Sequence, residues 1–395
     1  MPPLKVWKYR GKCPNGLTGV LLLQNGFAFV GCGFGAEGVR VGEVVFTTGM
    51  VGYHEALTDP SYKGQILVFT HPLIGNYGVP PYTALDELSG LPKYFESIGV
   101  KVEGVVVSNA TSPSHRLAAL SLDEWLRKEG VPGVHRVDTR LITTIIRSHG
   151  VVKGLIAVSR EAPDLDELWA KLLDSPSYDS TDFVKLVAPK NVAIHEPRNG
   201  RAKATIVVVD CGVKFGILRA LIKRGFRVVR VPPWLDPQRF IDEYRASGVV
   251  ISNGPGNPSL LDYAIKSTAA VLELGIPCLG ICLGNQLIAL ASGGAIYKLR
   301  YGHRGHNKPC IDLDTGRCYV TSQNHGYAVD AKSLSGTGLR VWFVNADDGS
   351  VEGLKHVSKP VIATQFHPEA SPGPRDTEWV FDLFAREVER HGATP

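Results

Sequence analysis

Several common features are missing from this sequence, and each absence argues against a class of protein. No apolar run among the 395 residues approaches the about 20 residues of a membrane-spanning helix. Residues 1–19 carry basic side chains but no apolar core with a small-residue cleavage site, so we expect no signal peptide. The net charge of +5 is small and spread along the chain, which gives no indication of nucleic-acid binding. The seven cysteines occur at irregular spacing, which favours a reducing cytoplasm.

Recognisable motifs for a nucleotide or a metal are also missing. The phosphate-binding loop G-x-x-x-x-G-K-[ST] does not occur, which is weak support for the absence of ATP chemistry because other ATP-binding folds lack this loop too. A zinc site could be drawn from His303, His306, Cys310 and Cys318. Their residue types suit zinc, but their spacing matches no common zinc pattern, so we expect no metal in this chain.

The sequence divides into two halves of different rhythm. With 44% hydrophobic residues the chain can bury a core in each of two domains. Residues 1–188 are predicted to form an N-terminal domain, of which 1–19 look like an extension. Residues 189–203 are polar and rich in turn formers, which is typical of a linker. Residues 204–395 are predicted to form the second domain.

The first half mixes strand and helix signals, so we predict a mixed α/β domain. The dipeptide Asn25-Gly26 between two apolar runs predicts a hairpin. Ser121 and Glu124 form a capping box that predicts the start of a helix. Strands are predicted over 43–47 and 65–70, and helices over 122–128, 139–147 and 164–173.

The second half alternates strands with helices. Strands are predicted over 205–209, 227–231 and 249–251, with a helix over 217–224. This order favours an α/β domain with a mostly parallel sheet flanked by helices on both faces. Active sites of such sheets form at the carboxyl ends of the strands.

Cys282 stands at one of these strand ends. An apolar run ends at Gly280, and a helical pattern begins after Gly284. Glycines on both sides of a central nucleophile are typical of a sharp strand-to-helix turn that exposes the side chain. The helix N-terminus would favour the thiolate, which is the reactive form. A cysteine that only fills space is the plain alternative, and it is the interpretation we prefer for Cys278.

A base and a carboxylate follow far downstream, at His367 and Glu369. The strand predicted over 361–366 delivers them, and Pro368 favours an extended backbone that turns both side chains to one side. An imidazole oriented by a carboxylate can activate a nucleophilic thiol. The loop 253–258 follows another strand, and its amides, with the Leu283 N–H, could bind an oxyanion.

Together these motifs resemble those of a known family. The segments 280–284, 253–258 and 367–369 are similar to class I glutamine amidotransferases. Motifs in the rest of the chain resemble the small subunit of carbamoyl phosphate synthetase; they are Thr48–Tyr53, Leu57–Tyr62, Ile74–Gly78, Val137–Arg140, Asn324–Tyr327 and Glu369–Pro374. The resemblance covers roughly residues 20–390.

The resemblance implies a division of chemistry. Cys282 would attack the side-chain amide of glutamine, His367 would shuttle a proton to the departing ammonia, and Glu369 would orient His367. The implied glutamine-binding residues are Ser61, Gly254, Gly256, Leu283, Gln286, Asn324, Gly326 and Tyr327. Because Ser61 belongs to the first half, we expect the pocket near an interdomain cleft.

The resemblance also implies partners and a setting. Ammonia would pass to a separate large subunit that holds ATP and magnesium and makes carbamoyl phosphate from bicarbonate, so this chain itself would need no cofactor. The implied setting is a cytoplasmic heterodimer in arginine and pyrimidine synthesis.

Three departures and three alternatives qualify the resemblance. Asn285 stands where many relatives have His, Gly216 where Asn is usual after Lys214, and residues 1–19 extend the pattern.

The alternatives are the amidotransferase of another synthase, a stand-alone cysteine hydrolase acting on peptides, and a catalytically silent binding subunit. Cleavage of glutamine rather than a peptide would separate the first from the second.

Overall fold

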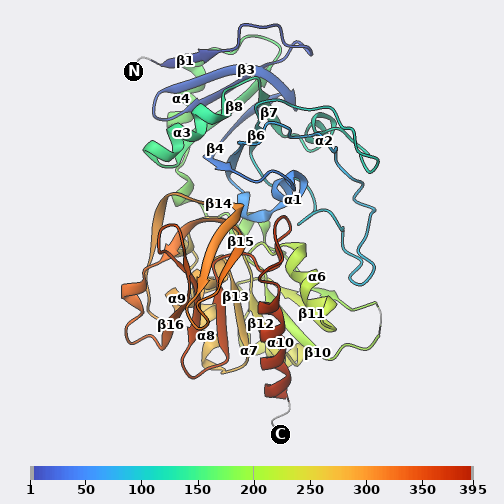
Figure 1. Cartoon of the computed structure of the whole chain (residues 1–395), viewed down its shortest axis with the longest axis vertical. Helices are drawn as coiled ribbons and strands as arrows, with labels where there is room; N and C mark the ends of the chain where they lie inside the picture. Colours follow the sequence, from blue (N-terminus) through green and yellow to red (C-terminus); the bar gives the residue numbers. More distant parts are fainter. Residues whose placement is uncertain (1–3, 199, 393–395) are drawn as a thin grey trace. The chain divides into compact units, whose positions relative to one another are not determined.

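Residues 4–198 and 200–392 are described by a computed structural model, drawn in Figure 1. Its internal contacts divide the chain into two compact units. Residues 1–84 and 97–181 form the first unit, and residues 85–96 and 182–395 form the second.

This division differs from the continuous domains that we predicted. Residues 85–96 lie within the first half of the sequence but pack with the second unit. The expected linker 189–203 contains strand β9 (Ala193–His195), which pairs with β11 and so belongs to the sheet of the second unit. Composition could not reveal either feature, because both depend on pairing between distant segments.

The first unit contains a closed sheet. Its strand order is β1-β3-β2-β8-β4-β5-β6-β7, and an additional pairing of β3 with β7 closes the ring. The strands are β1 (Lys5–Lys8), β2 (Thr18–Leu23), β3 (Phe27–Gly35), β4 (Gly38–Thr47), β5 (Gln65–Phe69), β6 (Gly104–Val106), β7 (Pro132–His135) and β8 (Val152–Ser159). The helices are α1 (Tyr53–Thr58), η1 (Pro60–Tyr62), α2 (Leu122–Lys128), α3 (Thr139–His149), α4 (Leu165–Asp174) and η2 (Tyr178–Ser180).

Local sequence signals explain several of these elements. β2 and β3 form the predicted hairpin around Asn25-Gly26. The predicted capping box starts α2: the Ser121 hydroxyl accepts from the Glu124 N–H, and the Glu124 carboxylate accepts from the Ser121 N–H. Both signals act over a few residues, so the sequence alone is enough to predict them.

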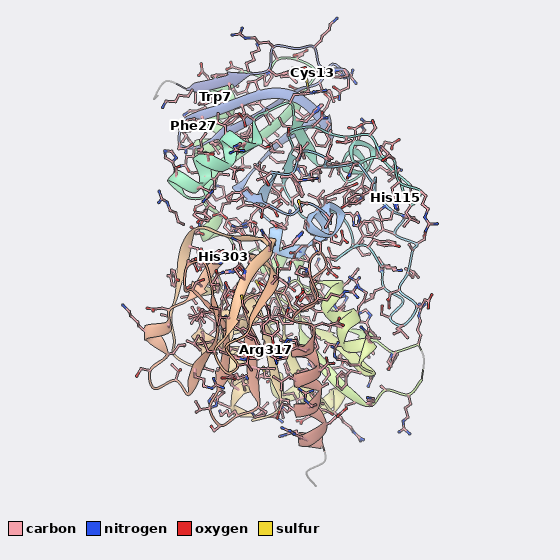
Figure 2. The ribbon with its side chains drawn as sticks, viewed as in Figure 1. Trp7, Cys13, Phe27, His115, His303 and Arg317 are labelled. Atoms are coloured by element: carbon pink, nitrogen blue, oxygen red, sulfur yellow. A yellow bond between two sulfur atoms is a disulfide. The ribbon has the colours of Figure 1, made fainter. Side chains whose placement is uncertain are left out.

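The N-terminal extension is attached to this sheet. β1 pairs in parallel with β3, and the Trp7 ring stacks on Phe27 with their centroids 5.4 Å apart (Figure 2). A disulfide joins Cys13 to Cys32 on β3. The irregular spacing of the cysteines did not predict this bond, so cysteine spacing no longer supports a reducing compartment.

The second unit is built on a ten-stranded sheet with the order β15-β14-β16-β17-β18-β13-β12-β10-β11-β9. Its strands besides β9 are β10 (Ala204–Val209), β11 (Phe226–Val231), β12 (Gly248–Ile251), β13 (Cys278–Ile281), β14 (Ile296–Asp312), β15 (Cys318–Val329), β16 (Leu339–Asn345), β17 (Val351–His356) and β18 (Val361–Thr364). Its helices are α5 (Val184–Val187), α6 (Phe215–Lys223), α7 (Pro237–Tyr244), η3 (Pro258–Leu260), α8 (Asp262–Glu273), α9 (Leu283–Ala291), η4 (Ala331–Leu334) and α10 (Trp379–Gly392).

The sheet of the second unit is mixed, which corrects the prediction of a mostly parallel one. Strands β18, β13, β12, β10 and β11 run parallel to their neighbours in this series. β9 at one edge and β17, β16, β14 and β15 at the other pair antiparallel. The antiparallel part follows α9, where short turns connect β14 to β15, β16 to β17 and β17 to β18, and only antiparallel strands can be joined in that way.

Alternating side chains of β10 enter two different cores. Ile206 and Val208 belong to a cluster with apolar residues of α6 and α10, whereas Val207 and Val209 belong to a cluster with residues of α7, α8 and α9. Helices therefore cover both faces of the parallel strands (Figure 1). Within the part of the chain that the structure describes, no helix is both long enough and apolar enough to cross a membrane.

Candidate functional site

Cys282 occupies the sharp turn between β13 and α9. Its backbone has φ 54° and ψ −100°, a conformation that is strained for a residue with a side chain. A Cβ atom at Gly280 would lie 2.6 Å from Ile288 Cδ1, and one at Gly284 would lie 2.1 Å from the Ile251 carbonyl oxygen. The two flanking glycines are therefore required by close packing of helix on strand, as the sequence predicted.

The thiol of Cys282 is buried, which contradicts the expectation that it faces outward. The residue is 2% exposed. Its Sγ donates to the Asn324 carbonyl oxygen at 3.6 Å and accepts from Gln365 Nε2 at 3.6 Å. The strand-to-helix turn does lift the side chain off the sheet, but β15 lies against it, and local geometry could not predict that neighbour.

Cys282 and the His367–Glu369 pair follow two strands that are neighbours in the sheet. β13 and β18 pair in parallel with Ile281 opposite Thr364, and the Cys282 N–H donates to the Thr364 carbonyl at 2.8 Å. His367 Nδ1 lies 2.6 Å from Glu369 Oε1. Burial lowers the pKa of His367, but the Glu369 charge and the neighbouring Cys282 outweigh burial and raise that pKa to about 10.

A lysine completes this group, and sequence reasoning did not give it a role. Lys214 Nζ donates to Glu369 Oε1 at 3.0 Å and to the Ala370 carbonyl at 2.7 Å. Burial would raise the pKa of Glu369, but Lys214 and His367 lower it to about 2. A carboxylate between two buried cations stays ionised, which fixes the orientation of the imidazole.

Glu96 lies behind Lys214 and was also missed. It is fully buried, pairs with Arg219, and accepts from the Gly216 N–H at 2.9 Å. A Cβ at Gly216 would lie 2.8 Å from Glu96 Oε2 and 2.9 Å from Glu369 Cγ. The departure at Gly216 therefore has a structural reason: the carboxylate of Glu96 fills the space beside this residue.

Gln286 and Asn285 share a hydrogen-bond acceptor beside the sulfur. Gln365 Oε1 accepts from Asn285 Nδ2 at 3.2 Å and from Gln286 Nε2 at 3.1 Å. Gln286 Nε2 also donates to the Tyr327 carbonyl at 2.8 Å. These bonds orient the Gln365 amide so that its nitrogen points at the Cys282 sulfur. Asn285, which stands where many relatives have His, therefore helps to position a neighbour of the sulfur. Gln365 itself was not singled out from the sequence.

The remaining residues of the second unit that were predicted to bind glutamine lie on several different elements. Gly254 packs against Cys211 so closely that a Cβ would lie 2.4 Å from its carbonyl oxygen. Leu283 is the first residue of α9, so its N–H has no acceptor within the helix. Gly256 lies in the 253–258 loop after β12, and Gly326 lies on β15 after Asn324.

Ser61 belongs to the first unit. It lies in η1, is 6% exposed, and its N–H donates to Asp59 Oδ1 at 2.9 Å. Its role in glutamine binding and the expected interdomain pocket stay predictions.

The four zinc candidates of the sequence do not come together. Among the described residues, the group of possible metal ligands that converges is His303, His325 and Glu352. It shares only His303 with the predicted set. The register of β14 on β15 explains the difference, because His303 pairs with His325 across the two strands.

The second unit has the sequence of a class I glutamine amidotransferase. The family model "Glutamine amidotransferase class-I" matches residues 207–386, and the model "Carbamoyl-phosphate synthase small chain, CPSase domain" matches residues 21–156. The chain belongs to the carbamoyl phosphate synthase small chain family, as a glutamine amidotransferase subunit.

Two carbamoyl phosphate synthase small chains match over nearly their whole length, and a longer multifunctional protein matches over part of its length. The carbamoyl phosphate synthase small chain of Pyrococcus furiosus is 53% identical over 371 residues, which are 94% of this chain and 98% of that protein. The small chain of Sulfurisphaera tokodaii is 49% identical over 379 residues, 96% and 99% of the two chains. The multifunctional protein ura1 of Schizosaccharomyces pombe is 44% identical over 390 residues, 94% of this chain and 17% of that protein. These relatives agree with the resemblance read from the sequence.

Proposed function

We propose that this chain hydrolyses glutamine with Cys282, His367 and Glu369, and passes the ammonia to a separate large subunit. The observation that carries the proposal is the meeting of two strand ends: Cys282 follows β13, and the His367–Glu369 pair follows the neighbouring β18. A strained nucleophile beside an imidazole that a carboxylate orients is the arrangement needed for acyl transfer.

The chemistry follows from the state of each group. Because Nδ1 of His367 is held by Glu369, the other ring nitrogen is the atom that shares a proton with the Cys282 sulfur, and a protonated ring stabilises the thiolate. The sulfur attacks the side-chain amide carbon of glutamine, and His367 returns the proton to the nitrogen as the carbon–nitrogen bond breaks. Ammonia leaves and a thioester remains. Water then hydrolyses the thioester to glutamate and restores the thiol.

Access to the sulfur requires a movement. Cys282 is 2% exposed, and its Sγ contacts the Asn324 carbonyl oxygen at 3.6 Å. We propose that glutamine displaces this contact and takes the place of the Asn324 backbone. Asn324, Gly326 and Tyr327 would then hold the amino and carboxyl groups of glutamine, together with Gln286 and with Ser61 from the first unit. The N–H groups of Leu283 and the loop with Gly254 and Gly256 would bind the oxyanion.

The large subunit is proposed from family membership. Carbamoyl phosphate synthase small chain names a subunit, and the match to ura1 covers a small part of a longer multifunctional protein. We propose that ATP, magnesium and bicarbonate bind to that partner and that this chain needs no cofactor for glutamine hydrolysis. The proposed setting is the cytoplasm, with carbamoyl phosphate entering arginine and pyrimidine synthesis.

The test is Cys282→Ala in the complex with the large subunit. Loss of the proposed nucleophile should lower glutamine hydrolysis by at least about 10³-fold, while synthesis from free ammonia should continue. The matched control is Cys278→Ala, which removes a buried thiol from the same β13 strand without touching the turn. Glutamine hydrolysis that survives in Cys282→Ala would refute the proposed nucleophile, and loss of ammonia-dependent synthesis would refute the division of labour.

A further inference from the structure

A second group of buried histidines lies in the antiparallel part of the sheet in the second unit. His303 lies on β14, His325 on β15 and Glu352 on β17; Figure 2 labels His303. The side chains are 7%, 1% and 0% exposed. One ligand atom of each residue lies within 4.8 Å of the other two.

The contacts of His303 leave a lone pair directed at the carboxylate. Its Nε2 lies 2.9 Å from Asp348 Oδ2, and since a carboxylate accepts, Nε2 donates. Nδ1 has no hydrogen-bond partner among the described residues and lies 3.4 Å from Glu352 Oε1. In the neutral ring, two lone-pair carriers therefore face one another.

His325 has the same arrangement with a different partner. Its Nδ1 lies 2.9 Å from the Tyr327 carbonyl oxygen, which can only accept, so Nδ1 donates. Nε2 is then an acceptor, yet it lies 3.3 Å from Gln323 Oε1 and 3.9 Å from Glu352 Oε1. The amide of Gln323 is held in this orientation because its Nε2 donates to Cys310 Sγ at 3.2 Å and to Thr321 Oγ1 at 3.1 Å.

The carboxylate of Glu352 is only half satisfied. Its Oε1 accepts from Asn345 Nδ2 at 2.9 Å, while Oε2 is buried and has no hydrogen-bond partner among the described residues. A buried carboxylate oxygen without a partner is costly. His303 Nδ1, His325 Nε2 and the Glu352 carboxylate thus lie together in one buried place, with Glu352 Oε1 as the oxygen near both rings, and a cation there would use the lone pairs of all three side chains.

We propose that His303 Nδ1, His325 Nε2 and the Glu352 carboxylate bind a divalent transition-metal ion of the zinc class, with the fourth position open to water. Two imidazoles and one carboxylate form a common ligand set for zinc, whereas magnesium and calcium prefer oxygen ligands. The separations of 3.4 and 3.9 Å from Glu352 to the two rings lie close to the about 3.3 Å expected between tetrahedral zinc ligands.

The neighbours of the two rings support the same assignment. Metal-binding histidines usually donate their second N–H to a carboxylate or a backbone carbonyl, which fixes the ring and its tautomer. Asp348 supplies the carboxylate for His303, and Tyr327 supplies the carbonyl for His325.

A metal here would connect three strands beside the proposed glutamine site. His325 follows Asn324, whose carbonyl contacts the Cys282 sulfur. An ion bound by β14, β15 and β17 would hold this part of β15 in place. The inference goes beyond the proposed function, and its test measures metal rather than glutamine hydrolysis.

The experiment uses the full chain without an affinity tag, in a Cys318→Ser background that removes an exposed thiol as a competing zinc ligand. Zinc is added to chelator-treated protein, and bound metal is measured by calorimetry and by metal analysis after gel filtration. Cobalt gives a second readout, because a tetrahedral site with nitrogen ligands absorbs strongly in the visible range. One equivalent of zinc per chain is expected.

Variants decide whether this cluster is the site. Glu352→Gln should lower zinc affinity at least about 100-fold, and Asp348→Asn should lower it about tenfold by freeing the His303 ring. His306→Asn is the matched control, since His306 lies on the same strand but outside the cluster, and it should bind like the parent.

Two outcomes would overturn the proposal. One is a folded parent protein that takes up no stoichiometric zinc, which would mean that a proton on His303, shared by Asp348 and Glu352, holds the cluster together. The other is zinc binding unchanged in Glu352→Gln and Asp348→Asn. If circular dichroism shows that Glu352→Gln is unfolded, Asp348→Asn decides, because its side chain is 43% exposed and tolerates the change.

Discussion

The second unit buries two clusters of histidine with glutamate, and they are built differently. In the first, Glu369 lies between His367 and Lys214, both within hydrogen-bond distance. In the second, Glu352 has an amide and imidazole rings as its neighbours. The lysine lowers the pKa of Glu369 despite burial, whereas burial raises the pKa of Glu352.

This difference separates a carboxylate held between a lysine and a histidine from one that has no lysine beside it, where Glu352 and Asp348 together raise the pKa of His303 against burial. Two buried cations keep Glu369 ionised, so it can orient and charge His367 without help from any ligand. Burial also lowers the pKa of His325 well below its ordinary value, so that ring adds no positive charge at neutral pH. The first cluster is suited to proton transfer, and the second suits a cation because one ligand atom each of His303, His325 and Glu352 lies within 4.8 Å of the other two.

The largest expected effect comes from Glu369→Gln. Without the carboxylate, His367 loses its orienting partner, and glutamine hydrolysis should fall about 10²- to 10⁴-fold. The pKa of His367 lies at about 10 in the folded protein, against an ordinary value of 6.5. The contribution of protonated His367 to the free energy of unfolding is therefore complete below pH 6.5 and disappears as the pH rises towards 10. The variant should lose this pH-dependent part of the stability, measured by thermal unfolding at several pH values. Stability that falls with rising pH as in the parent would contradict the His367–Glu369 coupling.

A smaller effect is expected from Lys214→Met. Removal of one partner from a buried ion pair should cost about 3 kcal/mol of stability, measured from the denaturant midpoint. The pKa of Glu369 should rise from about 2 towards its ordinary 4.5, so the parent should keep the contribution of this pair above pH 4.5 and lose it as the pH falls towards 2.

The matched control for Lys214→Met is Lys223→Met. Lys223 pairs with Glu378 at 3.1 Å, but its side chain is 58% exposed. Water screens such a pair, so the control should cost no more than about 1 kcal/mol. Equal losses in the two variants would show that burial does not strengthen the Lys214 pair.

The smallest effect is expected from Glu352→Gln in metal-free protein. The pKa of Glu352 is raised by burial, so its ionised form opposes folding at neutral pH. The neutral amide keeps an acceptor for Asn345, and we expect stability to stay equal or to rise by up to about 1 kcal/mol. With zinc bound, the sign should reverse. A loss of about 3 kcal/mol without metal would mean that Glu352 is paired as firmly as Glu369.

Local signals predicted part of the site correctly. The glycines around Cys282 and the run His367-Pro368-Glu369 follow from what one turn and one extended strand require, and both are found as predicted. Lys214 and Glu96 could not be recognised in this way. The hydrogen bond from Gly216 to Glu96 spans 120 residues, and no periodicity or motif connects two such segments.

The sheet shows the same limit. Alternating strands and helices correctly predicted the parallel centre, where β10 buries both faces. The antiparallel strand β14 is far more polar than the parallel strands β10, β12 and β13, but composition does not tell which strands pair with each other. Their pairing brings His303 beside His325 and places the Asn324 carbonyl on the Cys282 sulfur.

The sequence by itself determined the strand-to-helix turn at Cys282, the histidine and carboxylate that follow β18, and membership of an amidotransferase family. These features depend on backbone geometry and residue types within a few positions. Only the tertiary structure decided that the thiol is buried, that Lys214 balances Glu369, and that Glu352 lies between two imidazoles. The free energy of a buried charge depends on which groups surround it, and the surrounding groups come from strands far apart in the chain.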